Sequence, residues 1–242
     1  MFEIAKKLFL ALILATGLNA SQELSKNEIK QIEQLELFKR ANIQVVKAYD
    51  VGSLYLVDIQ VQGNNDQVFL TKDKKNLIPG DVINTATGQK IAIPADVSSI
   101  RGKEAFVYGS GTEEYFLFTD PECPYCKKFE AHFPKIEKNV KIRVFYYPLS
   151  FHKNAESLSI YVMSKKTKAE KIKAMLNVSV DDKGYINRKY AKGEEAKLEK
   201  ELAAQMEIAK KLKVQGTPAL FDKDGKKVVW VNLLAKYGIQ VK

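Results

Sequence analysis

The chain has 242 residues, of which 45% are hydrophobic, and its formal net charge is +10. This length suits one or two domains with an ordinary buried core. The lysines are spread along the whole chain and alternate with acidic residues, which is typical of solvated helix faces and not of a phosphate-binding track. The charge pattern therefore argues against nucleic-acid binding, and leaves open a weak attraction to anionic membranes or partners.

Residues 1–20 have the composition of an export signal. Lys6 and Lys7 precede an apolar run over residues 8–18, and Ala20 supplies a small residue before a polar stretch. The run is short for a membrane span, and an uncleaved amphipathic anchor is the alternative. We expect a cleavable signal peptide over residues 1–20 and a mature protein in the periplasm.

Residues 21–88 are predicted to form a small α+β module. Ser25 and Glu28 have the spacing of a capping box, so an amphipathic helix is expected over residues 25–40. Strands follow, and the run Gly63-Asn64-Asn65-Asp66 forms a turn between two of them. A module of this size is marginal alone and commonly gains stability by pairing with a second copy. The alternating segments that predict strands are 43–50, 53–61 and 67–72.

A change of composition at residues 89–111 indicates a linker between two domains. Pro94 opens a short helical pattern there, and Gly109-Ser110-Gly111 ends it. We therefore predict a linker helix in this segment.

The remaining residues, 112–242, are predicted to form an α/β domain. A buried strand over 115–120, a helix and a second strand over 141–148 make a βαβ unit, which favours a parallel strand pair. Residues 153–213 are expected to be mostly helical. Gly216-Thr217-Pro218 then leads into a hairpin, and a short helix ends the chain.

The chain contains two cysteines, Cys123 and Cys126. A disulfide closing so short a loop adds little stability through chain entropy, so reactivity explains the pair better. The strand before Cys123 delivers it to a helix N-terminus, where backbone N–H groups and the macrodipole stabilise the attacking thiolate. Cys126 lies in the first turn of this helix, which is expected to continue to Ile136, and it is placed to resolve a mixed disulfide. Pro124 suits a first helical turn.

A zinc site is the first alternative interpretation of the cysteine pair. Zinc needs four ligands, and His132 and His152 are the histidines that could join two cysteines. His132 is poorly placed because it lies on the same predicted helix. An inert structural disulfide is the second alternative. We expect no metal and no cofactor, and we interpret both histidines as partly exposed or structurally hydrogen-bonded.

Three segments of the chain resemble the DsbC/DsbG disulfide isomerases, a group of the thioredoxin-like superfamily. The run Phe118–Cys126 is similar to the active-site strand and helix of that group, Gly216–Ala219 to its cis-proline loop, and residues 68–88 to the end of its dimerisation domain. The segments have the family's order and spacing, which together are more specific than a Cys-x-x-Cys pair alone. One departure is that the extra structural disulfide of some members has no cysteines here.

The resemblance implies an α+β cystatin-like N-terminal dimerisation domain, a linker helix and an α/β thioredoxin-like domain with a helical insertion. It implies a V-shaped homodimer with a cleft between the catalytic domains. Cys123 is then the nucleophile and Cys126 the resolving thiol, with Pro124 and Tyr125 as the active-site dipeptide. Pro218 is expected to be cis and packed against the cysteine pair, and the backbone before it, at Thr217, to pair with an extended substrate.

The implied function is isomerisation or reduction of non-native disulfides in misfolded or cysteine-containing exported proteins. A membrane thiol reductase of the DsbD type would keep the pair reduced. A net oxidase of the DsbA type is the first alternative, although such oxidases usually carry valine where this chain has Thr217. A chaperone-like binder of unfolded exported proteins is the second alternative. The Pro-Tyr dipeptide resembles DsbG more than DsbC.

Overall fold

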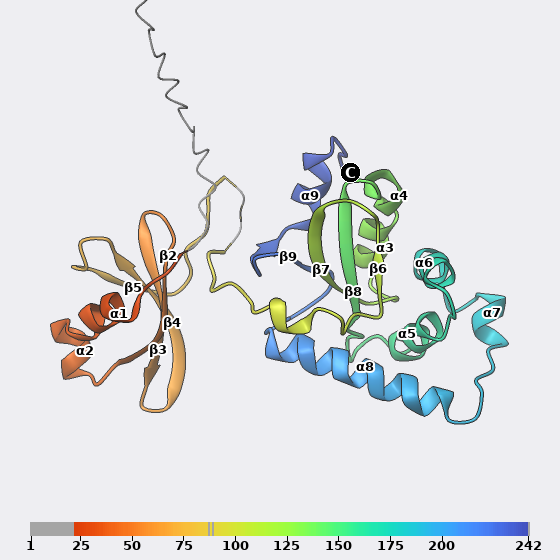
Figure 1. Cartoon of the computed structure of the whole chain (residues 1–242), viewed down its shortest axis with the longest axis horizontal. Helices are drawn as coiled ribbons and strands as arrows, with labels where there is room; N and C mark the ends of the chain where they lie inside the picture. Colours follow the sequence, from red (N-terminus) through yellow and green to blue (C-terminus); the bar gives the residue numbers. More distant parts are fainter. Residues whose placement is uncertain (1–21, 87, 89, 242) are drawn as a thin grey trace, which may run out of the picture. The chain divides into compact units, whose positions relative to one another are not determined.

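The computed structural model describes residues 22–86, 88 and 90–241 (Figure 1). The predicted signal peptide, residues 1–20, lies outside the described residues. The chain divides into two units, one ending at Val82 and the other beginning at Ile83. Among the described residues, no helix combines the length and apolar character needed to cross a membrane.

The first unit is the β-rich N-terminal region, a five-stranded antiparallel sheet with two short helices. Residues from both helices join Val45, Val57 and Val68 of the sheet in one buried cluster, so the helices cover one face of the sheet. The strands lie in chain order, from β1 to β5. The elements are β1 (Gln22–Glu23), α1 (Lys26–Glu33), α2 (Glu36–Arg40), β2 (Gln44–Asp50), β3 (Leu54–Val61), β4 (Asn64–Thr71) and β5 (Leu77–Pro79).

The single helix predicted over residues 25–40 is wrong, because the chain breaks at Leu35. The capping box forms as expected, with the Glu28 carboxylate accepting the Ser25 N–H at 2.8 Å. Leu35 is extended, at φ −62° and ψ 141°, and α2 begins after it. Phe38 lies six positions after Ile32. In a continuous helix this spacing would place the two side chains about 120° apart around the axis. The break allows both side chains to be buried in the same core.

The turn between β3 and β4 is tighter than the sequence pattern predicts. Gln62 and Gly63 form it alone, with φ values of 50° and 82°, and Asn64 already pairs with Val61. A two-residue turn with positive φ at both positions matches the right-handed twist of the flanking strands. The predicted turn residues from Asn64 to Asp66 therefore belong to β4.

The second unit contains a five-stranded sheet with the order β10-β9-β7-β8-β6. Strands β7 and β8 are parallel, as the βαβ pattern predicts, and the other pairs are antiparallel. The strands are β6 (Phe106–Tyr108), β7 (Glu113–Thr119), β8 (Val140–Tyr146), β9 (Ala219–Asp222) and β10 (Lys227–Val228). The helices are α3 (Pro124–Glu130), α4 (Phe133–Ile136), α5 (Ala155–Met163), α6 (Lys168–Asn177), α7 (Lys183–Ile186), α8 (Glu194–Lys211) and α9 (Trp230–Lys236).

Alternate residues of β7 point into two different hydrophobic clusters. Tyr115 and Leu117 belong to a cluster that includes residues of α3, α4, α5, α6, α7 and α9 and, from the N-terminal half of α8, Leu198 and Leu202. Phe116 and Phe118 belong to a second cluster, to which α8 contributes Ala209. Because successive side chains of a strand face opposite sides, the sheet is the middle layer of three. The central strand β7 ends at the segment that carries the cysteine pair (Figure 1).

The predicted linker helix is wrong. In the described part of the linker, Ser98–Ile100 form one turn of 3₁₀ helix, and Phe106–Tyr108 form strand β6 beside β8. The helical turn ends at Arg101, which is extended at ψ 135°, and Gly102 follows at φ 83°. The N–H of Ala95 donates to the carbonyl of Gly225 at 2.8 Å. The backbone N–H and C=O groups of this segment thus form hydrogen bonds with the sheet edge and the hairpin, and not with one another along a helix.

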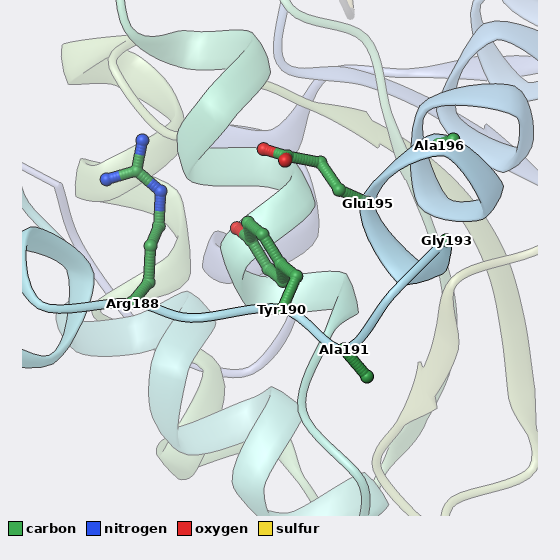
Figure 2. Close-up of a pocket in the computed structure, with 6 residues that line it drawn as sticks. All are labelled: Arg188, Tyr190, Ala191, Gly193, Glu195 and Ala196. Carbon is green, nitrogen blue, oxygen red and sulfur yellow. The ribbon is translucent and has the colours of Figure 1, made fainter.

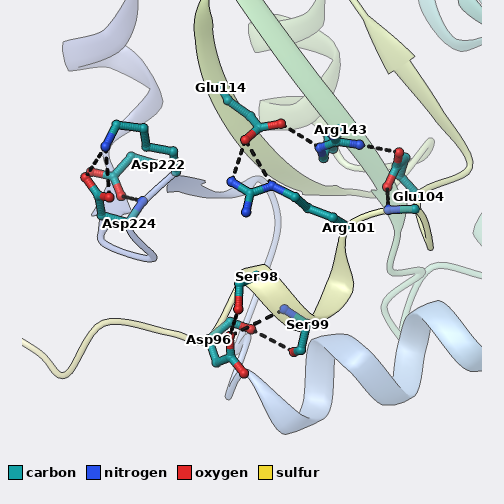
Figure 3. A network of polar contacts seen from close by, with 11 residues as sticks. Asp96, Ser98, Ser99, Arg101, Glu104, Glu114, Arg143, Asp222 and Asp224 are labelled. Atoms are coloured by element: carbon teal, nitrogen blue, oxygen red, sulfur yellow. Dashed lines mark hydrogen bonds and ion pairs between the residues drawn. The ribbon is translucent and has the colours of Figure 1, made fainter.

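A chain of ion pairs holds the linker against the sheet (Figure 3). Glu114 of β7 accepts from Arg101 at 2.6 Å and from Arg143 of β8 at 2.8 Å. Arg143 also contacts Glu104 at 2.5 Å. Both guanidinium groups lie over the Phe116 ring, at 5.4 and 6.0 Å. Two linker residues are therefore tied to the two parallel strands that position the cysteine pair.

The helix after the cysteines is interrupted, whereas the sequence pattern predicts one continuous helix to Ile136. Helix α3 ends at Glu130, and α4 begins at Phe133. Pro134 causes the break, because it has no N–H to donate to the carbonyl of Glu130 and its ring crowds that position.

The C-terminal hairpin is shorter than predicted. Strand β10 ends at Val228, and Trp230 begins helix α9. The Trp230 ring centroid lies 5.5 Å from that of Phe129 on α3. Partial burial of this large ring against α3 explains why Val228 and Val229 do not continue into a longer strand.

Candidate active site

Cys123 lies where β7 gives way to α3, at the end of a loop over residues 120–123 that we call the active-site loop. Its extended backbone, at φ −72° and ψ 119°, makes it the N-cap of α3, and Pro124 is the first helical residue. The Cys123 N–H donates to the carbonyl of Asp120 at 3.1 Å. Its thiol donates to the carbonyl of Thr217 at 3.3 Å. The sulfur is thus held between a helix start and a second loop.

That second loop carries the cis-proline. The Thr217–Pro218 peptide bond is cis, as the family resemblance implies. Strand β9 follows it directly and pairs with β7 through Ala219 and Phe118, so sheet pairing brings a loop 94 residues away to the cysteine. The Thr217 hydroxyl is buried and has no hydrogen-bond partner among the described residues. A thiolate would offer this hydroxyl an acceptor.

The two sulfurs of the pair differ in acidity. The pKa of Cys123 is lowered to about 5, and the hydrogen bond from the Cys126 thiol is the largest cause. The backbone N–H groups of Cys126 and Tyr125 and the side chain of Thr217 lower it further, whereas burial opposes the shift. Burial raises the pKa of Cys126, and its hydrogen bond to Cys123 and the charge of Glu130 raise it further. At neutral pH the pair therefore contains one thiolate and one thiol.

A buried carboxylate lies one helical turn beyond the pair. Glu130 is four residues after Cys126 on α3 and is 2% exposed. The Thr119 hydroxyl donates to its Oε1 at 2.5 Å, and the Lys127 ammonium lies 3.9 Å from its Oε2. Burial raises the pKa of Glu130 to about 7, although Lys127 and Thr119 lower it. A group with this pKa can take up and release a proton at neutral pH.

A second buried carboxylate joins the active-site loop to the loop after β8. Asp120 is 0% exposed and accepts hydrogen bonds from the Leu149 N–H at 2.7 Å and from His152 Nδ1 at 2.8 Å. Glu122 accepts from the backbone N–H and the side-chain amide of Asn154, at 2.6 and 2.9 Å. These bonds fix the loop after β8 beside the nucleophile.

The predicted site residues lie together at one end of β7 and β9. Cys123 contacts Cys126 and Thr217, and Tyr125 is 66% exposed beside them. Glu130 was not predicted, although a sequence signal exists. It is an acid at an apolar position of the helix, between Phe129 and Phe133.

The roles of Asp120 and His152 had no usable signal in the sequence. The two residues are 32 positions apart, and only the parallel pairing of β7 with β8 brings their loops together. The other histidine, His132, is the N-cap residue of α4.

A separate hollow of about 640 Å³ lies at the N-terminus of α8 (Figure 2). None of its lining residues is a cysteine or a histidine, so it forms no part of the candidate active site. The residues around it are Arg188, Tyr190, Ala191, Gly193, Glu195 and Ala196.

Comparison with known proteins yields one family match. A model described as a thioredoxin-like domain matches residues 109–232. The chain belongs to the thioredoxin-like family. With a dithiol at the start of α3, this thioredoxin-like protein is a thiol–disulfide oxidoreductase. No curated protein matches the chain.

Several solved structures are similar to this thioredoxin-like chain. The catalytic domain of Proteus mirabilis ScsC is 21% identical, with a TM-score of 0.42, and the match covers 58% of this chain and 92% of that one. A disulfide interchange protein from Neisseria gonorrhoeae is 22% identical, with a TM-score of 0.40, covering 51% and 81%. Helicobacter pylori DsbG is 14% identical, with a TM-score of 0.39, covering 82% and 100%.

Proposed function

We propose that this protein isomerises or reduces non-native disulfides in exported proteins, with Cys123 as the nucleophile and Cys126 as the resolving thiol. The observation that carries the proposal is the difference in pKa between the two sulfurs. A disulfide isomerase must attack as a thiolate and must also be able to free itself from a mixed disulfide. A low-pKa sulfur in contact with a protonated one meets both needs.

In the first step the Cys123 thiolate attacks one sulfur of the substrate disulfide. A mixed disulfide forms, and the other substrate sulfur leaves as a thiolate. The Thr217 carbonyl accepts from the Cys123 thiol only while that sulfur is protonated, and it loses this donor when the sulfur ionises. A backbone N–H of an extended substrate is then its natural partner, which supports the proposed role of the Thr217-Pro218 loop in substrate binding.

The mixed disulfide then has two fates. In isomerisation, a substrate thiolate attacks it and frees Cys123. In reduction, Cys126 loses its proton and attacks Cys123, which gives the Cys123–Cys126 disulfide and a reduced substrate. Burial opposes the ionisation of Cys126, so this step needs a base. Glu130, on the same helix with a pKa of about 7, is placed to accept that proton. A membrane thiol reductase of the DsbD type would return two electrons.

We further propose that residues 21–88 are a cystatin-like dimerisation domain, that residues 89–111 link it to the catalytic domain over 112–242, and that two copies form a V-shaped homodimer. Support comes from the small core of the first unit, which resembles that of domains stabilised by pairing. We place the mature protein in the periplasm after removal of residues 1–20.

A net disulfide oxidase of the DsbA type is the second candidate function. The observation that favours it is the pKa of Cys123, about 5, because a stabilised thiolate favours the reduced form and makes the disulfide a stronger oxidant. The residue before the cis-proline, Thr217, favours the isomerase.

The redox state of the cysteine pair in the periplasm distinguishes the two candidates. Rapid acid quenching and alkylation should find a predominantly reduced pool for an isomerase or reductase. A fully oxidised pool would overturn that proposal in favour of the oxidase. Refolding of a scrambled disulfide substrate should fail with the Cys123→Ser variant. Activity that survives in this variant would argue for chaperone-like binding and against thiol chemistry.

A further inference from the structure

His152 is a histidine on the loop after β8 that the proposed chemistry does not yet use. Its Nδ1 lies 2.8 Å from Oδ2 of Asp120, and its side chain is 19% exposed. The carboxylate of Asp120 is fully buried. A buried carboxylate is costly unless it is paired and hydrogen-bonded, and His152 is the cation of this pair when its imidazole is protonated.

Asp120 also connects His152 to the backbone of the nucleophile. Its main-chain carbonyl accepts the Cys123 N–H at 3.1 Å, and its Oδ1 accepts the Glu122 N–H at 2.8 Å. Asp120 thus binds His152 through its carboxylate and the N-cap residue of α3, Cys123, through its main-chain carbonyl. The imidazole lies beside the same loop that positions the Cys123 sulfur.

We propose that His152 is a positioning residue whose imidazolium stabilises the Cys123 thiolate, so that the protonation of His152 follows the redox state of the cysteine pair. This inference rests on the proposed function, because it concerns the same nucleophile. It adds a proton site that lies outside the dithiol and its helix.

The charges around His152 support this coupling. Asp120, Cys123 and Glu122 of the active-site loop face it, and Lys153 follows it on its own loop. The pKa of His152 is raised, first by the hydrogen bond to Asp120 and then by the charges of Asp120, Cys123 and Glu122, while burial lowers it. Coupling between two sites is reciprocal, so an imidazolium favours the thiolate as much as the thiolate favours the imidazolium. Disulfide formation removes one of these negative charges.

The proton balance of substrate reduction gives the coupling a role. Two electrons pass from the cysteine pair to the substrate disulfide, one sulfur–sulfur bond forms in the protein, and the substrate leaves as two thiols. Those thiols need two protons. The Cys126 thiol supplies one, by way of Glu130, and the Cys123 thiolate has none to give. The imidazolium of His152 supplies the second from Nε2, because Nδ1 stays bonded to Asp120. The summed charge of Cys123, Cys126 and His152 is then zero before and after the reaction.

The first test is an NMR titration of the imidazole protons of the full chain in its reduced and oxidised forms. The chain has two histidines, so His132 is an internal reference. The pKa of His152 should be higher in the reduced protein by at least about half a unit. An equal pKa of His152 in both redox forms would overturn the proposal.

The second test separates a charge effect from loop positioning alone. His152→Gln keeps an N–H donor for Asp120 but removes the cation. It should raise the pKa of Cys123, read from thiolate absorbance, by about half a unit, a threefold change in the ionisation constant. The reduction potential of the cysteine pair in this variant should become more negative, because the reduced form with its thiolate is less stable. Asn154→Ala is the matched control, because it removes a hydrogen bond between the same two loops and no charge. Equal shifts in both variants would overturn the proposal.

Neither readout depends on catalysis, so the two proposals can fail separately. A protein without isomerase or reductase activity, but with a redox-dependent His152, would refute the proposed function and leave the coupling standing. An active enzyme whose His152 titrates identically in both redox forms would refute the coupling alone.

Discussion

Glu130 lies one helical turn beyond Cys126 on α3, and its carboxylate is buried while the Thr119 hydroxyl donates to it. Burial therefore acts on both groups in the same direction. It raises the pKa of the Cys126 thiol and brings that of Glu130 to about 7. The result is a thiol that resists ionisation beside an acid that exchanges its proton near neutral pH.

Replacing Glu130 by glutamine should stabilise the protein at high pH. The pKa of Glu130 is about 7 in the folded protein against an ordinary 4.5, so the wild type loses stability as pH rises through this window. The loss amounts to about 3 kcal/mol, and glutamine avoids it while still accepting from Thr119. Urea unfolding at pH 4 and pH 8 measures this. A stability difference between variant and wild type that is the same at both pH values would contradict the buried charge.

The same variant should slow the release of reduced substrate. We expect Glu130→Gln to lower the rate of disulfide reduction by about one hundredfold, the low end of a general base's contribution. The wild-type rate should rise with pH through about 7, as Glu130 ionises, and the variant should lack this step. Alkylation of Cys123 by iodoacetamide serves as the control, since attack by Cys123 does not need Glu130. Equal slowing of both reactions would point to a distorted site.

Alkylation should also distinguish the two cysteines. The pKa of Cys123 is about 5, whereas that of the fully buried Cys126 is raised, so a short treatment at pH 6 should label Cys123 alone. Peptide mass spectrometry locates the label, and the pH dependence of its rate should have a midpoint near 5. The Cys123→Ser variant should remain unlabelled under these conditions. Label on Cys126 would contradict the assignment of the nucleophile.

The parts of the site that were predictable from the sequence are local. A buried strand, a Cys-x-x-Cys pair and a proline in the first turn are consecutive, so periodicity and capping preferences place Cys123 at a helix start. The remaining contacts are not local. Thr217 reaches Cys123 from 94 positions away, and His152 reaches Asp120 from 32. The family resemblance predicted that Pro218, next to Thr217, packs against the cysteine pair, and nothing in the sequence predicted the contact of His152 with Asp120.

Two errors in the predicted elements show what local patterns miss. The helical pattern of the linker is overridden because strand β6 completes the edge of the sheet beside β8. The helix at residues 25–40 is broken because one core must bury both Ile32 and Phe38. In each case tertiary packing outweighs a weak local preference.

Gly225 should be intolerant of any side chain. Its φ is 79°, and a Cβ there would overlap the carbonyl of Ala95, whose N–H bonds to the carbonyl of Gly225. Gly193 is the matched control, because its φ is 80° and its surroundings are open. Gly193→Ala should cost about 1 kcal/mol from backbone strain, and Gly225→Ala at least about 2 kcal/mol more. Thermal unfolding compares them. Equal costs would show that the linker does not pack against the hairpin.

Arg143 should contribute more to stability than a surface ion pair does. It contacts both Glu104 and Glu114, and all three side chains are 15% exposed or less (Figure 3). In Arg143→Ala the two poorly solvated carboxylates, Glu104 and Glu114, are left with Arg101 as the remaining cation of the chain of ion pairs. We therefore expect the free energy of unfolding to fall by about 3 kcal/mol. Arg143→Lys should recover part of it, because one ammonium cannot reproduce the fork of the guanidinium.

The control for Arg143 is Lys210→Ala, which breaks an exposed pair with Glu207. That loss should stay below about 1 kcal/mol and should shrink further in high salt, because solvent screens exposed charges well. Urea unfolding of the four proteins at two salt concentrations gives the comparison. If Arg143→Ala costs no more than Lys210→Ala, the ion pairs are not what holds the linker to the sheet. In that case the hydrogen bonds of β6 and of Ala95 account for the attachment.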